Sequence, residues 1–185
     1  MDKNVKADLS GLEDLLRALK GEYFLRVGII GSKATGSHDS ESGKTNAEIG
    51  TFHEFGTTKM PRRSFLEDSL KYKLNPTTKE FKQLKKGIFK FVFLKKSPKD
   101  FLQDLGAKCL EIIEEGFATS GFGMWKQLSA SYYNQKMSKA PKRLTPKSME
   151  WFNYHQILTD TGKLRKSIAF KVMKKSWYNQ QKITH

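Results

Sequence analysis

Apolar residues recur at helical spacing in several parts of the chain. The first case begins at Ser10, which forms a capping box with Glu13 and precedes four leucines on one face, and Gly21 ends the pattern. Residues 117–150 are rich in Gly, Ser, Lys and Pro, which predicts irregular structure. The same helical periodicity predicts three further helices and one or two late turns, at Ser64–Tyr72, at Thr78–Leu94, from Ser97 to the turn before Gly116, and at Thr161–Ser167.

Two segments near the start read as strands. Tyr23–Ile30 is rich in β-branched and aromatic residues, and Ala47–Phe55 alternates between two faces. Residues 32–46 between them contain no apolar side chain larger than Ala34, so we expect a mobile loop that joins the strands as an antiparallel hairpin. A further short strand is predicted at Ile168–Met173.

The order of these elements predicts an α+β fold, in which a small antiparallel or mixed β-sheet packs against long α-helices and carries a mobile hairpin loop. With 185 residues the chain is long enough for one domain with a substantial core. We place that domain at residues 1–175. The basic tail at 176–185 is expected to fray.

Composition narrows the functional classes. No apolar run approaches the roughly 20 residues of a membrane-spanning helix. No apolar signal segment follows Met1, so we expect a protein that stays in the cytoplasm where it is made, with no membrane partner. The single Cys109 argues against an internal disulfide and a multi-cysteine zinc site. Its place on an apolar helix face predicts a buried, inert thiol.

The net charge of +15 is unevenly distributed. Residues 59–99 contain 13 basic and 3 acidic side chains, and residues 136–185 contain 12 basic and 2 acidic side chains. This asymmetry favours a polyanionic neighbour, either nucleic acid or an acidic protein surface, and a solvated basic face is the alternative. If residues 78–94 are helical, Lys79, Lys82, Lys86 and Lys90 share one face of that helix.

Two local patterns invite catalytic readings that the residues do not support. Gly43-Lys44-Thr45 lacks the earlier glycine of a phosphate-binding loop, because His38 occupies that position. His53-Glu54 lacks the second histidine of a zinc peptidase, because Thr57 stands there. We therefore expect no enzyme activity, no metal and no cofactor.

Five pieces of sequence follow one another in an unusual order. They are Val27-Gly28-Ile29, His53-Glu54-Phe55-Gly56-Thr57, Pro61-Arg62-Arg63-Ser64-Phe65-Leu66, Phe122–Leu128 and Leu158–Ile168. In this order they resemble the virion-morphogenesis proteins of tailed bacteriophages, the tail-completion or head–tail joining group. The resemblance spans about residues 23–173, and the Lys-rich segments at 71–99 and 136–147 depart from it.

The resemblance implies a structural protein of the virion tail or neck, assembled in the host cytoplasm. It implies a homo-oligomeric ring, a hexamer in this family, that contacts a tail terminator or tail tube and a head connector, with packaged DNA close by. A basic DNA-contacting accessory protein of a phage or mobile element is the alternative function. The residues that match the family motifs, which we assign to assembly contacts, are His53, Glu54, Phe55, Gly56, Thr57, Pro61, Arg62, Trp125, Thr161, Gly162, Leu164 and Arg165.

Several motif residues also have structural interpretations. Gly56 can adopt a positive φ at a turn, and Phe65 can pin a short helix to the core. Asp160 or Thr161 can cap the turn that begins at Gly162. Trp125 can stack on a base, but a Trp in a glycine-rich loop is more often an anchor that packs the loop onto a core or a partner.

Overall fold

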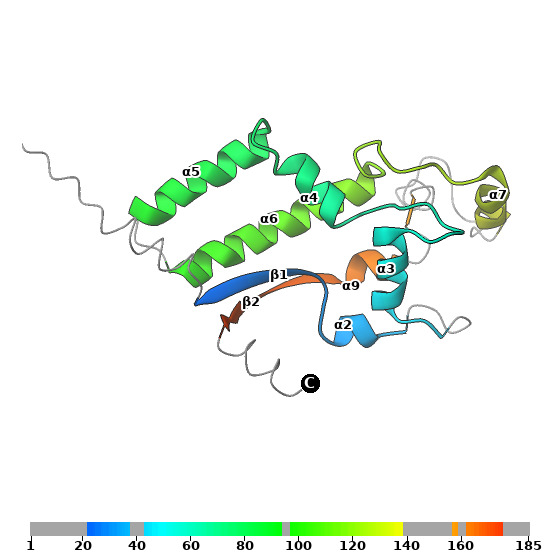
Figure 1. Ribbon diagram of the computed structural model, residues 1–185, viewed down its shortest axis with the longest axis horizontal. Helices are drawn as coiled ribbons and strands as arrows, with labels where there is room; N and C mark the ends of the chain where they lie inside the picture. The colour runs from blue at the N-terminus through cyan, green and yellow to red at the C-terminus, as the bar shows by residue number, and fades with distance from the viewer. Residues whose placement is uncertain (1–21, 38–42, 94–96, 139–156, 159–161, 176–185) are drawn as a thin grey trace, which may run out of the picture. The chain divides into compact units, whose positions relative to one another are not determined.

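The computed structural model describes residues 22–37, 43–93, 97–138, 157–158 and 162–175 (Figure 1). Its contacts divide into two compact units, of which the second contains Val27–Leu74 and Cys109–Ala169. In chain order the elements are β1 (Tyr23–Ile29), α2 (Ser32–Thr35), α3 (Asn46–Phe55), α4 (Glu67–Lys73), α5 (Lys79–Phe93), α6 (Pro98–Ala118), α7 (Ala130–Ser138), α9 (Lys163–Ser167) and β2 (Ile168–Lys174).

The described elements form an α+β fold with a small sheet, which confirms the predicted class. Within the described residues, the sheet has two antiparallel strands, β1 and β2. At one end the Lys175 N–H donates to the Glu22 carbonyl at 2.9 Å. The strands predicted at Tyr23–Ile30 and Ile168–Met173 are therefore confirmed, but the predicted hairpin is wrong, since β1 pairs with the end of the described chain.

The segment predicted as a second strand, Ala47–Phe55, is the helix α3. A capping box starts this helix: the Thr45 hydroxyl accepts the Glu48 N–H at 3.2 Å, and the Glu48 carboxylate accepts the Thr45 N–H at 2.8 Å. The hydrogen bonds from Thr45 also lower the pKa of Glu48. The alternation that suggested a strand is overridden by this cap, and Ile49 and His53 share a helical face.

The predicted mobile loop at residues 32–46 is also partly corrected. Ser32–Thr35 forms the single turn α2, which packs against α3. The buried Asn46 side chain donates to the Lys33 carbonyl at 3.0 Å, and its N–H donates to the Gly36 carbonyl at 3.0 Å. Hydrogen bonds therefore hold both ends of this segment against α3, and residues 38–42 lie outside the described residues.

Three predicted helices are confirmed as α4, α5 and α6, with boundaries shifted by up to three residues. The stretch at 117–150, predicted to be irregular, contains the helix α7, which was not predicted. In its first turn the Tyr133 N–H donates to the Ser129 carbonyl at 2.8 Å. The predicted helix after Ser10 and the basic tail at 176–185 lie outside the described residues, and the single domain at 1–175 stays a prediction.

The second unit is organised around a core of large apolar side chains. The Phe117 ring lies 5.4 Å from the Phe65 ring and meets the Trp125 ring edge-on at 5.6 Å, measured between centroids. Figure 1 shows α3 beside α9, and the two helices are in contact. The buried members of the core are Phe65, Ile113, Phe117, Trp125, Ile157, Leu164 and Ile168.

Cys109 lies on the buried side of α6, as predicted. Burial raises the pKa of its thiol, because the thiolate would lose its hydration. The thiol therefore stays protonated at neutral pH, which agrees with an inert core residue. In the described part of the chain, no helix is long and apolar enough to cross a membrane.

The first unit contains α5, the beginning of α6 and most of β2. Gly106 in α6 lies directly against the Phe170 ring of β2, so that a Cβ atom added at Gly106 would lie 2.2 Å from the ring. Gly87 in the middle of α5 has no such neighbour within 4 Å. Close packing thus requires a glycine at position 106 but not at position 87.

We predict that Gly106→Ala and Gly87→Ala change the free energy of unfolding in opposite directions. Gly106→Ala should lower it by about 1–3 kcal/mol, because the methyl group overpacks the Phe170 contact. Gly87→Ala should raise it by about 0.5–1 kcal/mol, because Ala costs less backbone entropy in a helix than Gly. Urea unfolding followed by circular dichroism measures both; a stabilised Gly106→Ala variant would contradict the close packing.

Candidate functional site

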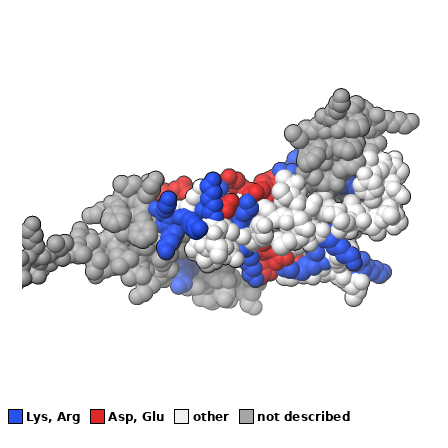
Figure 2. Space-filling model, turned by 90° about the horizontal axis from the view of Figure 1, so that it is seen from above, with Lys and Arg blue, Asp and Glu red and all other residues white. Residues whose placement is uncertain are grey.

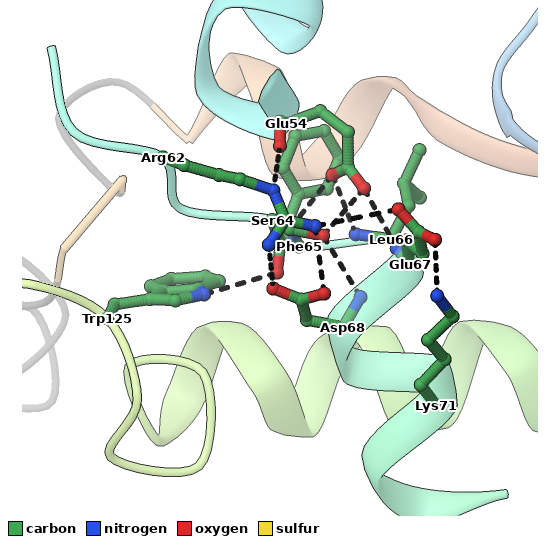
Figure 3. Close-up of polar contacts among 9 residues, drawn as sticks. All are labelled: Glu54, Arg62, Ser64, Phe65, Leu66, Glu67, Asp68, Lys71 and Trp125. Carbon is green, nitrogen blue, oxygen red and sulfur yellow. Dashed lines mark hydrogen bonds and ion pairs between the residues drawn. The ribbon is translucent and has the colours of Figure 1, made fainter. Parts of the chain in front are cut away.

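A buried carboxylate joins the end of α3 to the start of α4. The Glu54 side chain is only 6% exposed and accepts four hydrogen bonds (Figure 3). The donors are the Ser64 hydroxyl at 2.7 Å and the backbone N–H groups of Phe65, Leu66 and Glu67 at 3.0, 3.0 and 2.9 Å. The first N–H groups of a helix have no partner within it, so Glu54 satisfies donors at the start of α4 and its charge meets the positive end of that helix.

Ser64 extends this network in two directions. Its hydroxyl accepts the Asp68 N–H at 3.0 Å, and its carbonyl accepts the indole N–H of Trp125 at 3.2 Å. Gly121, with φ +68°, lets the chain pass so close to Trp125 that a Cβ there would lie 2.2 Å from the indole nitrogen. Trp125 is thus an anchor that packs its loop onto the core, which confirms that interpretation over an exposed base-stacking platform.

Arg62 closes the turn between the two helices from outside. Its Nε donates to the Glu54 carbonyl at 3.1 Å, and its terminal nitrogens pair with both oxygens of Asp68 at 2.6 and 2.8 Å. The hydrogen bonds to Asp68 raise the pKa of Arg62. Gly56 makes the turn possible with φ +76°, and a Cβ at this position would lie 2.9 Å from the Arg62 backbone nitrogen.

His53, Phe55 and Thr57, from the same motif as Glu54, do not bond to the Glu54 carboxylate. The His53 carbonyl accepts the Arg63 N–H at 2.8 Å, and the Thr57 hydroxyl accepts the Lys59 and Met60 N–H groups. His53 is a helical residue rather than the strand residue predicted. Phe55 is 68% exposed, although it adjoins the buried Glu54.

The described residues of the motif Leu158–Ile168 also belong to the second unit. Gly162 has φ +66° at the start of α9, Leu164 is buried in the core together with Ile168, and Arg165 forms an ion pair with Glu114 of α6. Thr161, predicted as an assembly residue and a cap, lies outside the described residues. The assembly role assigned to the motif residues stays a prediction, and their described positions show that Glu54, Trp125 and Leu164 serve the core.

The predicted basic face lies on α5, in the first unit. Lys79, Lys82 and Lys86 are exposed, while Phe81, Leu84 and Ile88 on the opposite side are half-buried, and the Lys90 side chain is outside the described residues. Figure 2 shows Lys and Arg side chains gathered over the part of the molecule that carries α5.

Sequence reasoning missed a cleft of about 670 Å³ in the second unit. Its described walls combine apolar side chains, among them Ile49, Met60 and Leu128, with the cations Lys59, Arg63 and Lys126. Pro61, His53, Gly162 and Leu164 from the predicted assembly set also line it. The two arginines of Pro61-Arg62-Arg63 are the sequence feature that could have indicated a cationic site here. The sequence does not show, however, that Arg63 rather than Arg62 lines the cleft.

Comparisons with models of protein families, with curated proteins and with solved structures found no match. Among the described residues, no group of three or more His, Cys, Asp or Glu side chains is placed to hold a metal ion.

We predict that Glu54→Gln lowers the free energy of unfolding by at least about 2 kcal/mol, because the amide cannot accept all four hydrogen bonds and its NH₂ group meets backbone donors. The matched control is Glu48→Gln in the same helix, which removes the same charge from an exposed position and should have a smaller effect. Equal unfolding midpoints for the two variants in urea would show that the Glu54 network does not hold the turn.

Proposed function

We propose that this protein is a non-enzymatic structural component of a tailed phage or prophage. In this proposal it completes the tail or the neck and joins head to tail as one subunit of a homo-oligomeric ring. Its neighbours are a tail terminator or tail tube on one side and a head connector on the other.

The observation that carries the proposal is the convergence of the motif pieces. The described parts of all the pieces that resemble the phage proteins lie in the second unit. They supply Ile29, Phe65, Trp125, Leu164 and Ile168 to one core and its immediate surroundings. Pieces that are far apart in sequence thus cooperate in one fold, as expected if the ordered motifs reflect a common architecture rather than chance.

The exposed Phe55 supports an assembly role for that fold. Its motif neighbour Glu54 is buried, whereas Phe55 at the end of α3 is 68% exposed. Aromatic side chains are enriched at subunit interfaces, where their burial supplies a large share of the binding energy. We assign Phe55 to the contact between neighbouring subunits of the ring.

The alternative function, a DNA-contacting accessory protein, is favoured by one observation. The exposed lysines Lys79, Lys82 and Lys86 share one face of α5, beside an additional exposed Lys85. Such a row of ammonium groups suits sequence-independent attraction to phosphates better than base recognition. The two functions are compatible if this face borders the path of packaged DNA.

We predict that Phe55→Ser weakens self-association at least about tenfold without unfolding the subunit, because the ring contributes to the interface and not to the core. Tyr72→Gln is the control, since it removes another exposed aromatic side chain, 49% exposed, from outside the motif. Sedimentation equilibrium measures association of both variants and of the parent chain. A parent chain that stays monomeric at high concentration and is absent from purified particles by mass spectrometry contradicts the ring.

For the basic face, we predict that changing Lys79, Lys82, Lys86 and Lys90 together to Glu leaves the circular dichroism spectrum intact and blocks head–tail joining or DNA retention in particles. The parallel change of all four to Gln removes the charge without reversing it and should give a weaker defect. Duplex binding that is lost in the Glu variant, with a steep salt dependence in the parent, would favour the DNA-contacting function. Normal particle yield from the Glu variant would show that the face is only solvated.

A further inference from the structure

Arg63 is a buried cation without a carboxylate partner in the described chain. Its side chain is only 7% exposed at the wall of the 670 Å³ cleft. Nε donates to the Lys126 carbonyl at 2.9 Å and Nη2 donates to the Gln127 carbonyl at 3.4 Å. Burial lowers the pKa of Arg63, whereas the pKa of neighbouring Arg62 is raised by the hydrogen bonds to Asp68.

This arrangement leaves a charge to be neutralised from outside. Burying a guanidinium is costly unless it is paired, and two carbonyl dipoles compensate less than one carboxylate does. Among the described residues, the Arg63 side chain makes its hydrogen bonds through Nε and Nη2, so the two N–H donors of Nη1 can serve a bound anion. A planar fork of this kind matches a carboxylate or a phosphate.

The remainder of the cleft indicates which anion fits. The exposed Lys59 and Lys126 add positive charge, and no Asp or Glu is among the described lining residues. Ile49, Met60 and Leu128 supply an apolar surface beside the charges. The lining therefore offers a cationic point at Arg63 next to space for aliphatic side chains.

We propose that this cleft binds a segment of a partner protein in which acidic residues adjoin leucine or similar aliphatic residues. An Asp or Glu carboxylate of the segment binds Arg63, and an adjoining aliphatic side chain packs on Met60 and Leu128. A protein segment fits better than a nucleic acid, because Arg63 is recessed and the walls are partly apolar, whereas phosphate backbones are contacted by exposed cations such as those of α5. This site goes beyond the proposed ring and does not depend on it.

The test uses the purified full chain and fluorescein-labelled peptides in fluorescence anisotropy. The probe is Asp-Leu-Glu-Leu-Asp, and the matched peptides are its neutral counterpart Asn-Leu-Gln-Leu-Asn and its polar counterpart Asp-Ser-Glu-Ser-Asp. We expect the probe to bind and each matched peptide to bind at least about tenfold more weakly, since one lacks the carboxylates and the other the aliphatic groups.

Two sets of variants separate binding from folding. Arg63→Gln should weaken probe binding at least about 30-fold, as loss of one member of a buried charge pair does. Because Arg63 also holds the 126–127 backbone, the second variant is Lys59→Glu combined with Lys126→Glu, which changes only exposed side chains and should also abolish binding. Lys99→Glu at the start of α6 is the control, because Lys99 is exposed and belongs neither to the cleft nor to the basic face of α5, and it should bind the probe like the parent.

Three outcomes would overturn the proposal. The probe does not bind the folded parent chain, or it binds the Lys59→Glu, Lys126→Glu variant as well as the parent. The third is that a single-stranded oligonucleotide displaces the probe and depends on Arg63 more strongly than the peptide does, which would assign the cleft to phosphate. A monomeric parent chain that still binds the probe would contradict the ring and leave this site supported.

Discussion

The buried carboxylate of Glu54 is the interaction on which the second unit depends. A negative charge in a protein interior is costly unless hydrogen-bond donors surround it, and here one hydroxyl and three backbone N–H groups do so. These bonds fix the end of α3 to the start of α4. They thereby place Phe65 in the core and aim the Ser64 carbonyl at Trp125. The Glu54 carboxylate can reach these donors only if the chain turns sharply between the two helices. Gly56 makes this turn possible with its positive φ, and Arg62 stabilises it by donating to the Glu54 carbonyl.

The elements that could be predicted from the sequence are those whose own apolar pattern decides their structure. In α5 and α6 the apolar side chains recur every three or four residues over several turns, and β1 is a short run of aromatic and branched residues, so local preference and burial agree. α3 is different, because residues 47–55 alternate with the two-residue period of a strand and yet form a helix. The helix is favoured by the Thr45–Glu48 capping box and by contacts with α2 and α9. Of these, only the capping box can be recognised in the sequence.

The candidate site shows a sharper limit. Arg62 and Arg63 are adjacent and chemically identical, yet their environments shift their pKa values in opposite directions. Arg62 faces Asp68 on the outside of the turn, while Arg63 turns inward to the carbonyls of Lys126 and Gln127. Those carbonyls lie more than sixty positions along the chain, directly after the buried Trp125. A pattern confined to the motif therefore identifies an arginine-rich turn but not which arginine is buried.

The partition between the two units explains how a strongly basic segment can coexist with this closely determined core. The lysines of α5 belong to the first unit, whereas the described motif pieces belong to the second. The lysines of α5 are exposed and make no part of the Glu54 network or of the apolar core that surrounds it. Charge on α5 can thus change without removing any hydrogen bond of the Glu54 side chain. The exposed lysines of α5 and the residues of the Glu54 network are therefore separate sets, so that a substitution in one set leaves the side-chain contacts of the other in place.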